Sequence, residues 1–146
     1  MNRKLEKKDK SAYINMSCAF YKTDAVLSKI NPENLHKTFQ AIIDQNPYVD
    51  GFMIEKDGEA AGYALVSFTY SNPMGGVVLL LEELFIKDTY RGKGLGKQSL
   101  KELEAYYDDR VVAMRLEVVN DNEPAIRLYS DLGFEDVDYL QMKKTL

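Results

Sequence analysis

The sequence is poor in the residues that hold small folds together covalently or through metals. Among its 146 residues there is one cysteine, Cys18, and one histidine, His36. A single thiol excludes an internal disulfide framework, and one thiol with one histidine leaves no credible metal site. Because no histidine lies at a recognisable spacing from Cys18, we do not expect a covalent acyl-cysteine intermediate either.

Long apolar segments and an excess of positive charge are also missing. The longest unbroken apolar run, residues 77–81, is far too short to cross a bilayer. The basic residues 1–10 contain no apolar stretch of the kind that a signal peptide needs. With 19 basic and 23 acidic residues the net charge is −4, which argues against binding to the phosphate backbone of nucleic acids. We therefore expect a cytoplasmic protein that binds neither nucleic acid nor membrane.

What the chain does contain is ordinary for a globular protein. Hydrophobic residues make up 45% of it and charged residues 29%. At this length a compact fold removes roughly 68–70% of the unfolded chain's surface from water. Only four prolines occur, no repeat is visible and no stretch resembles a linker. We therefore expect residues 1–146 to form a single domain.

The first half of the chain predicts one strand, two helices and three further strands. Asn31-Pro32-Glu33 has the form of a helix start, with a proline in the first turn next to an acid. Asp57-Gly58 lies between two β-rich segments and predicts a hairpin, so the last three strands form an antiparallel meander. The expected segments are strand 2–5, helix 9–26, helix 31–47 and strands 52–55, 61–70 and 77–86.

The second half predicts a right-handed parallel crossover. Strand 77–86 is nearly continuously apolar, as expected where both faces are covered. A glycine-rich turn, a helix with core-compatible leucine spacing and strand 111–119 follow it. A last helix runs from about residue 121 to Gly133, and two short strands, 134–136 and 137–144, end the chain. The expected fold class is α/β with a mixed α+β sheet, in the order β-α-α-β-β-β-α-β-α-β-β.

The glycine-rich turn, residues 90–97 (YRGKGLGK), is the most informative segment of the chain. Alternating glycines let the backbone approach a bulky anion, and their amides can point into one concave nest. The start of the following helix adds its positive dipole end, and Arg91, Lys93 and Lys97 add full charges. These features predict a cradle for a pyrophosphate. A flexible basic turn without a ligand is the alternative.

Two familiar phosphate-binding motifs do not fit this turn. A P-loop needs glycine at position 91 and Ser or Thr at position 98, which hold Arg91 and Gln98. The dinucleotide fingerprint that starts at Gly92 and Gly94 needs a third glycine at position 97, which holds Lys97. Neither a P-loop nucleotidase nor a Rossmann dehydrogenase is therefore expected.

The pattern Arg91-x-x-Gly94-x-Gly96, between a strand and a helix, resembles the acetyl-coenzyme A signature of the GNAT superfamily of N-acetyltransferases. The resemblance includes the strand before it, residues 80–86 (LLEELFI). It also includes residues 122–134 (NEPAIRLYSDLGF), which look like the second diagnostic block of the family. The matched motifs occupy residues 80–134, and the order of elements extends the likeness over nearly the whole chain.

The resemblance implies where acetyl-CoA would lie. In this family the strand before the glycine turn and the next parallel strand splay apart. The pantetheine arm lies in that gap, paired with the backbone of the first strand, and the amides of the turn hold the pyrophosphate. The cofactor-binding residues that the resemblance implies are Leu84, Phe85, Ile86, Arg91, Gly92, Lys93, Gly94, Leu95, Gly96, Lys97, Asn122 and Tyr129.

Tyr129 is the candidate general acid. Asn122 and Tyr129 are seven residues apart, which is two helical turns, so both face one side of the last helix. Asn122 could then bond the pantetheine arm while Tyr129 reaches the thioester sulfur. A neutral phenol is a suitable acid for a departing thiolate. The alternative is a half-buried tyrosine that only packs.

Glu82 and Glu83 are the candidates for the base that deprotonates an amine. They are adjacent in an otherwise apolar strand, so we expect their side chains to point to opposite faces. A carboxylate among leucines is partly desolvated, which raises its pKa toward a useful range. By position Glu82 resembles the base of several family members, acting directly or through waters, while Glu83 lines the acceptor pocket or bonds a neighbouring element. Both could instead be salt-bridged structural acids.

The end of the first helix is the candidate acceptor pocket. Phe20, Tyr21 and Asp24 provide an aromatic wall and an acid, which would suit a cationic amine. With Glu82 and Glu83 they make up the expected substrate-binding residues. The same side chains are equally consistent with a helix end that packs on the core.

These residues together predict an acyltransferase that moves an acetyl group from acetyl-CoA to a primary amine in a ternary complex. Glu82 takes the amine proton, Tyr129 protonates the sulfur, and backbone amides of 84–86 polarise the thioester oxygen. The acceptor belongs to a small molecule or a peptide, and a homodimer is expected from the resemblance. A coenzyme A-binding sensor without turnover is the alternative function, and a longer acyl donor is the alternative chemistry.

Overall fold

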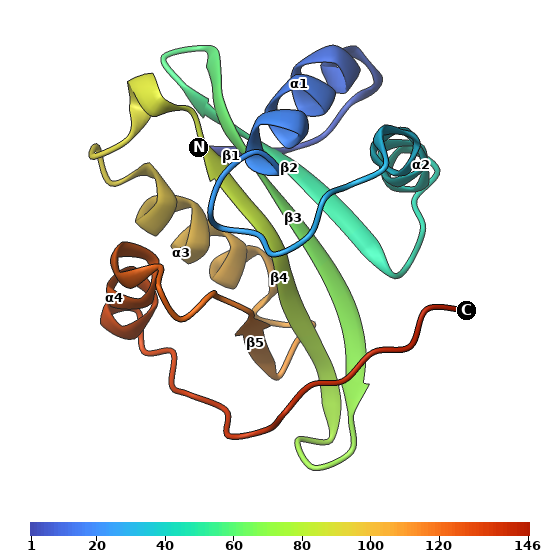
Figure 1. The fold of residues 1–146 in the computed structure, drawn as a ribbon, viewed down its shortest axis with the longest axis vertical. Helices are drawn as coiled ribbons and strands as arrows, with labels where there is room; N and C mark the ends of the chain where they lie inside the picture. The colour runs from blue at the N-terminus through green and yellow to red at the C-terminus, as the bar shows by residue number, and fades with distance from the viewer.

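A computed structural model describes all 146 residues as a five-stranded sheet with four α-helices (Figure 1). Two short 3-10 turns, at Lys7–Asp9 and Asp88–Tyr90, supplement them. The elements are β1 (Asn2–Lys4), α1 (Lys10–Phe20), α2 (Pro32–Ile43), β2 (Val49–Lys56), β3 (Glu59–Ser71), β4 (Gly76–Ile86), α3 (Leu95–Tyr107), β5 (Ala113–Leu116) and α4 (Glu123–Asp131). The order agrees with the sequence prediction as far as α4, and the predicted fold class is confirmed.

The five strands lie in the order β1-β2-β3-β4-β5, and only β4 and β5 run parallel. Their pairing extends from Val78 opposite Ala113 to Leu81 opposite Leu116. Strand β4 then continues to Ile86 without a partner on that side, while β5 has already ended. The two parallel strands therefore separate midway along β4, as predicted.

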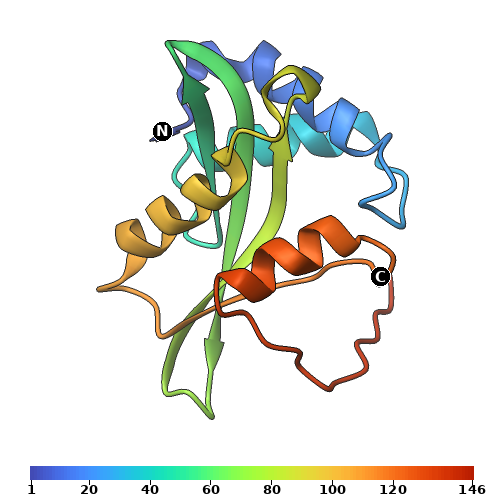
Figure 2. The same cartoon turned by 90° about the vertical axis from the view of Figure 1, so that its left-hand side faces the viewer.

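Helices cover both faces of the sheet. Figure 2 shows α1 and α2 on one side of the strands and α3 on the other. One core cluster joins α1 and α2 to the sheet through residues such as Tyr13, Phe39 and Tyr63. A second cluster joins α3 to the opposite face through Leu79 and Leu103. No helix of the fold has both the length and the apolar character needed to span a membrane.

The start of α2 follows its sequence signal, whereas the end of α1 does not. The Asn31 side chain accepts a hydrogen bond of 3.0 Å from the Glu33 amide and caps α2. Helix α1 ends at Phe20, not near residue 26, because the amide and the hydroxyl of Thr23 both donate to the Phe20 carbonyl, at 3.0 and 2.7 Å. Residues 25–26 still pack against the core, so their apolar spacing does not require a helix.

The C-terminal part of the chain departs most from prediction. Strand β5 spans Ala113–Leu116, not 111–119, and the strands predicted at 134–136 and 137–144 are not formed. Apolar side chains in the last segment remain in water: Tyr139 is 82% and Leu140 88% exposed. A strand gains stability by burying one face against a neighbour, and from residue 135 onward every side chain of this segment is exposed.

Candidate active site

A β-bulge in β4 sets the positions of the two adjacent glutamates. The register pairs Leu65 of β3 with Glu83 and Val66 with Leu81, so Glu82 has no residue opposite it. An extra residue of this kind shifts the alternation of side chains along its strand. The prediction that Glu82 and Glu83 point to opposite faces is therefore wrong, because it assumed a strand without a bulge.

The hydrogen bonds of the two carboxylates confirm that they share a face. Glu83 accepts a bond of 2.6 Å from the Tyr63 hydroxyl, and Glu82 accepts one of 2.5 Å from the Ser67 hydroxyl. Tyr63 and Ser67 are four residues apart on β3, so their side chains lie on the same side of the sheet. That side is the one covered by α1 and α2, since Tyr63 belongs to their core cluster.

Glu83 lies in an aromatic enclosure. It is only 7% exposed, and its second oxygen accepts a short hydrogen bond from the hydroxyl of Tyr21, the C-cap residue of α1. Burial raises the pKa of the Glu83 carboxyl, the two phenol hydrogen bonds oppose that shift, and the nearby Glu82 adds to it. Glu83 is thus the desolvated carboxylate of the pair, and it ties α1, β3 and β4 together.

Glu82 differs from its neighbour because it is exposed to solvent. Its hydrogen bond to Ser67 fixes one oxygen, while the carboxylate stays open to an incoming amine or water. From the sequence, one carboxylate was expected to be both accessible to substrate and raised in pKa, but in the structure these two properties belong to different residues. The accessible carboxylate is Glu82, and the one with a raised pKa is Glu83.

The predicted acceptor pocket is only partly assembled. Tyr21 reaches Glu83, and the Phe20 ring lies 5.2 Å from the Tyr21 ring in an edge-on arrangement. Phe20 itself is buried in the core. Asp24 is exposed beyond the end of α1 and forms neither a hydrogen bond nor an ion pair through its side chain. Of the three residues, Tyr21 alone contacts a glutamate.

The glycine turn leaves the start of α3 open for an anion. Gly92 and Gly94 adopt left-handed conformations, with φ of +71° and +77°. Leu95, Gly96 and Lys97 occupy the first three positions of α3, so their amides have no partner within the helix, and no side chain caps them. Free amides at a helix start are able to bind an anion, and the pyrophosphate cradle stays a prediction.

The charges of the turn are partly used to hold its own shape. The Arg91 side chain donates from Nε to the Ile86 carbonyl at 3.0 Å and pairs with Asp88 at 3.0 Å. Lys93 donates from Nζ to the Thr89 carbonyl, also at 3.0 Å. Both cations were predicted to contact phosphate, and in this structure both also brace the turn.

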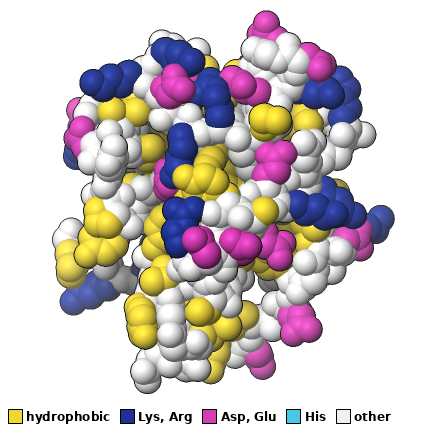
Figure 3. Space-filling view, turned by 180° about the vertical axis from the view of Figure 1, so that it is seen from behind, with side chains coloured by type: hydrophobic (Ala, Val, Ile, Leu, Met, Phe, Trp, Pro, Cys, Tyr) yellow, Lys and Arg dark blue, Asp and Glu magenta, His cyan; other side chains and the backbone are white.

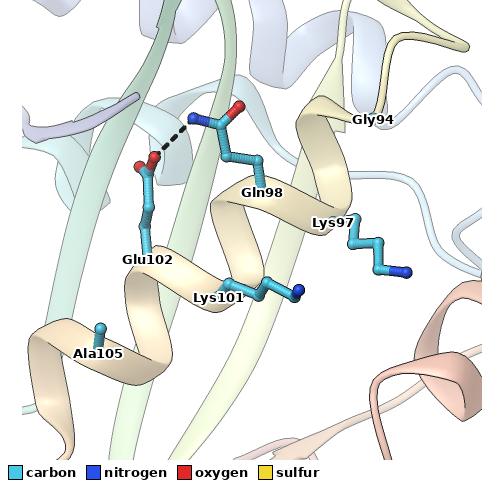
Figure 4. A pocket seen from close by; sticks show the side chains of 6 residues that line it. All are labelled: Gly94, Lys97, Gln98, Lys101, Glu102 and Ala105. Carbon is cyan, nitrogen blue, oxygen red and sulfur yellow. Dashed lines mark hydrogen bonds between the residues drawn. The ribbon is translucent and has the colours of Figure 1, made fainter.

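A hollow of about 400 Å³ follows the outer surface of α3 from the glycine turn (Figure 4). Lys97 and Lys101 are one helical turn apart and point to one side of the helix in this view. Gln98 and Glu102 point to the other side, joined by a hydrogen bond of 2.8 Å. Lys97 and Lys101 together place two positive charges on this side of α3. Lys101 was not predicted as a site residue, although its position four residues after Lys97 could have indicated it.

Helix α4 packs against the first turn of α3. A methyl group placed at Gly96 would lie 3.6 Å from the Leu128 side chain and 3.8 Å from that of Leu84, so α4 meets α3 and β4 there. Asn122 caps α4 by accepting a 3.3 Å bond from the Ala125 amide, which gives it a structural role beside its predicted one. Burial raises the pKa of Tyr129, which keeps its phenol neutral.

Tyr63 and Ser67 belong to the candidate site although they were not predicted for it. Both lie on β3 and hold the two glutamates. Alternation along 61–70 places Tyr63, Leu65 and Ser67 on one face. Two hydroxyl-bearing residues on that face, in a strand expected to pair with the one that carries Glu82 and Glu83, could have indicated these hydrogen bonds.

Gly62 was also not predicted as part of the site. A methyl group there would lie 2.1 Å from the Phe85 carbonyl oxygen, so only glycine fits beside the end of β4.

Comparisons with known proteins identify the family of the chain. A family model described as "Acetyltransferase (GNAT) family" matches residues 16–134. Thialysine N-epsilon-acetyltransferase of Bos taurus is 36% identical over 77 residues, which are 52% of this chain and 45% of that protein. The chain thus spans less than half the length of this relative.

Two solved structures share the fold. A possible acetyltransferase from Clostridium difficile 630 superposes with a TM-score of 0.86 at 17% identity, over 100% of this chain and 97% of that one. AAC(6')-Iy in complex with the bisubstrate analog CoA-S-monomethyl-acetylneamine superposes with a TM-score of 0.82 at 18% identity, again over 100% and 97% of the two chains. At such identities the likeness extends to the fold alone.

Proposed function

Because the chain belongs to the acetyltransferase (GNAT) family, we propose that it transfers an acetyl group from acetyl-CoA to a primary amine. One observation carries the proposal. Beyond Leu81 the edge of β4 is unpaired, and it leads into a helix start with free amides. An acyl-CoA combines an amide-bearing arm with a pyrophosphate, and these two neighbouring features match its two parts.

The donor would be held mainly by backbone groups. The free edge of β4 at Leu84, Phe85 and Ile86 pairs with the pantetheine amides, and the amides of 92–97 hold the pyrophosphate. Lys97 and Lys101 add positive charge on the outer side of α3 (Figure 4). Arg91 and Lys93 support the turn, through the carbonyls of Ile86 and Thr89.

The proposed chemistry uses the accessible carboxylate and the neutral phenol. Glu82 takes a proton from the ammonium form of the acceptor, directly or through a water, and the amine nitrogen then bonds to the thioester carbon. Backbone amides of 84–86 stabilise the oxyanion. The carbon–sulfur bond breaks, and Tyr129 gives its proton to the sulfur, which leaves as the thiol of coenzyme A. The Tyr129 phenolate then takes the second proton from the nitrogen, which leaves a neutral amide and restores the phenol.

We propose a small cationic primary amine as the acceptor. Glu82 and Glu83 place two carboxylates on the face of the sheet next to the end of α1, and Tyr21 contributes an aromatic ring there. Opposite charge and a ring face both attract an ammonium group. The bovine relative is named for thialysine, and the AAC(6')-Iy complex carries an analog of an acetylated aminoglycoside, both of which contain primary amines.

We further propose that the chain forms a homodimer. The outer edge of β5 has no neighbouring strand, and the segment after α4 exposes Val137, Tyr139, Leu140 and Met142. An unpaired strand edge and a group of exposed apolar side chains each favour association with a second copy. Sedimentation velocity at increasing concentration tests this, and a monomer mass that does not change with concentration would overturn it.

The first experiment is calorimetry of acetyl-CoA binding to the wild type and to Gly94→Trp. Gly75→Trp is a matched control, because Gly75 also has a left-handed φ, +68°, and open space around it, but lies in the turn between β3 and β4. We expect binding to be lost only in Gly94→Trp, with similar melting temperatures for the two variants. No binding to folded wild type would overturn the proposal.

Turnover is then tested by release of coenzyme A thiol with a panel of amines. Thiol release that depends on both acetyl-CoA and a primary amine is the expected result. Binding of acetyl-CoA without any amine-dependent release would instead favour a coenzyme A-binding sensor. Faster release with a longer acyl-CoA would change the proposed donor and leave the site unchanged.

A further inference from the structure

A second cavity, of about 860 Å³, lies at the end of the sheet away from the glycine turn. It is bounded by the first residues of β2 and β4, the last residues of β3 and the C-terminal end of α3. Val77 lines it at the start of β4, whereas the glycine turn follows the other end of that strand. The glycine turn and the cavity lie at opposite ends of α3, whose 13 residues are roughly 20 Å long, and the cavity shares no lining residue with the hollow beside the turn.

The walls of this cavity are mostly apolar and include several aromatic rings. Phe68 and Tyr107 contact each other, with ring centroids 5.3 Å apart. Tyr48 and Tyr70 also line it, yet they are 72% and 69% exposed, so packing within the chain does not account for them. Cavities of this volume with an apolar, aromatic lining and a few polar groups are typical of small-molecule sites.

Positive charge predominates among the ionised groups of the lining, which are Lys4, Arg110 and Asp50. The Asp50 carboxylate is already engaged, because it pairs with the Lys4 ammonium and accepts a 2.6 Å bond from the Tyr107 hydroxyl. Arg110 has one acidic partner, the exposed Asp109 at 3.3 Å, which does not line the cavity. The net charge of the lining is thus +1, from two cations and one anion.

Both cations are held in position by aromatic rings. The Arg110 guanidinium lies 4.6 Å from the centroids of Tyr106 and Tyr107, and the Lys4 ammonium lies 4.7 Å from that of Phe52. Burial of Lys4 and repulsion from Arg110 lower the pKa of its ammonium to about 8. An anion near these two cations would relieve their repulsion. Figure 3 shows the side of the molecule on which α3 lies, where basic and apolar side chains adjoin.

We propose that this cavity binds a small aromatic monocarboxylate, with the carboxylate at Lys4 and Arg110 and the ring against Phe68, Tyr70 and Tyr107. A carboxylate matches the planar fork of a guanidinium. A flat ring fits the aromatic walls, and a single negative charge matches the net charge of the lining. The proposal is independent of the acetyl transfer proposed above, since it uses none of the same residues.

The test uses 2-naphthoate as the probe, titrated into the full chain by calorimetry, with 2-naphthamide as the neutral isostere. We expect saturable binding of the acid at one site and binding of the amide weaker by roughly tenfold or more, as for loss of a charge-assisted hydrogen bond. Amide chemical shifts should change around the cavity and not at 91–97. Equal affinity for acid and amide, or shifts confined to 91–97, would overturn the proposal.

Variants then locate the charge contact. Arg110→Gln should weaken 2-naphthoate roughly tenfold while leaving 2-naphthamide and acetyl-CoA unaffected. Arg115→Gln is the matched control, because Arg115 is exposed on β5 and does not line the cavity. Equal losses in the two variants would overturn the assignment. The assignment would also be overturned if the wild type is a dimer that Arg110→Gln dissociates and that 2-naphthoate leaves intact. The cavity would then belong to an interface between two copies of the chain.

Discussion

The hydroxyl of Tyr63 donates a 2.6 Å hydrogen bond to Glu83, a carboxylate that is only 7% exposed. Tyr21 supplies a second hydrogen bond from the end of α1. An acid without a cationic partner is therefore kept inside the fold by two neutral phenols. Phenol hydrogen bonds only partly offset the desolvation of a carboxylate, so this arrangement has a measurable pH dependence.

Glu83→Gln should make the protein less sensitive to pH. Burial raises the pKa of Glu83 in the folded state above its ordinary value of 4.5. Between the unfolded and the folded pKa the native state binds more protons, so the contribution of Glu83 to the free energy of unfolding falls as pH rises. Glutamine does not titrate, so the stability of the variant relative to wild type should increase with pH. Urea denaturation from about pH 4 to about pH 8 measures this difference.

The matched control for that experiment is Glu82→Gln, because Glu82 is the adjacent but exposed acid. Its stability relative to wild type should change little over the same range. If Glu83→Gln instead loses stability relative to wild type as pH rises, the two phenols stabilise the charged carboxylate more than burial destabilises it.

Glu82→Gln should lower kcat by roughly a hundredfold or more, the usual contribution of a general base. The loss should shrink as pH rises toward the pKa of the acceptor amine, because a free amine needs no base. Ser67→Ala, which removes only the 2.5 Å hydrogen bond to this carboxylate, should give a much smaller loss. Rates of thiol release across pH provide the measurement. A loss in Glu82→Gln that is the same at every pH would exclude the role of base.

The position of these glutamates explains why the sequence predicted the site only in part. A motif such as Arg91-x-x-Gly94-x-Gly96 specifies local backbone geometry, so the glycine turn and the start of α3 could be predicted from neighbouring residues alone. The bulge at Glu82 arises from the pairing of β4 with β3, and no local signal marks which residue is left unpaired. The sequence therefore predicted both acids and not their common face.

The two ends of the chain differ in how well their strands were predicted. The N-terminal strand was predicted, and in the structure its backbone extends the sheet beside β2. Two C-terminal strands were also predicted, but they are not formed, and Tyr139 and Leu140 remain exposed to solvent. A strand forms where a neighbouring strand offers a free edge and where one face of the new strand is buried. The β-propensity of its residues determines neither of these conditions.

Tyr129→Phe should reduce kcat by roughly a hundredfold and leave the affinity for acetyl-CoA unchanged. Burial raises the pKa of Tyr129, so the phenol holds its proton until the thiolate departs. Tyr139→Phe is the matched control, because Tyr139 is 82% exposed in the C-terminal segment. Calorimetry for acetyl-CoA and thiol release for turnover separate the two quantities. Unchanged turnover in Tyr129→Phe would remove this residue from the mechanism.

Gly94 and Gly96 should respond oppositely to alanine. Gly94 has a φ of +77°, a conformation that costs an alanine about 1–2 kcal/mol, so Gly94→Ala should lower the melting temperature and weaken acetyl-CoA binding. Gly96 is helical, and a methyl group there would lie 3.6 and 3.8 Å from Leu128 and Leu84, which is ordinary contact. Gly96→Ala should therefore stabilise the protein by up to about 1 kcal/mol.

Acetyl-CoA affinity in the two alanine variants identifies which glycine admits the ligand. If strain at Gly94 alone shapes the turn, Gly96→Ala binds acetyl-CoA as wild type does, because its methyl group points at α4 and not at the free amides. Gly96→Ala could instead be stable and lose affinity for acetyl-CoA as Gly94→Ala does. The pyrophosphate would then lie against the first turn of α3, and the space for it would be limited by Gly96 as well as by the two left-handed glycines. Thermal melts and calorimetry on both variants decide between these geometries.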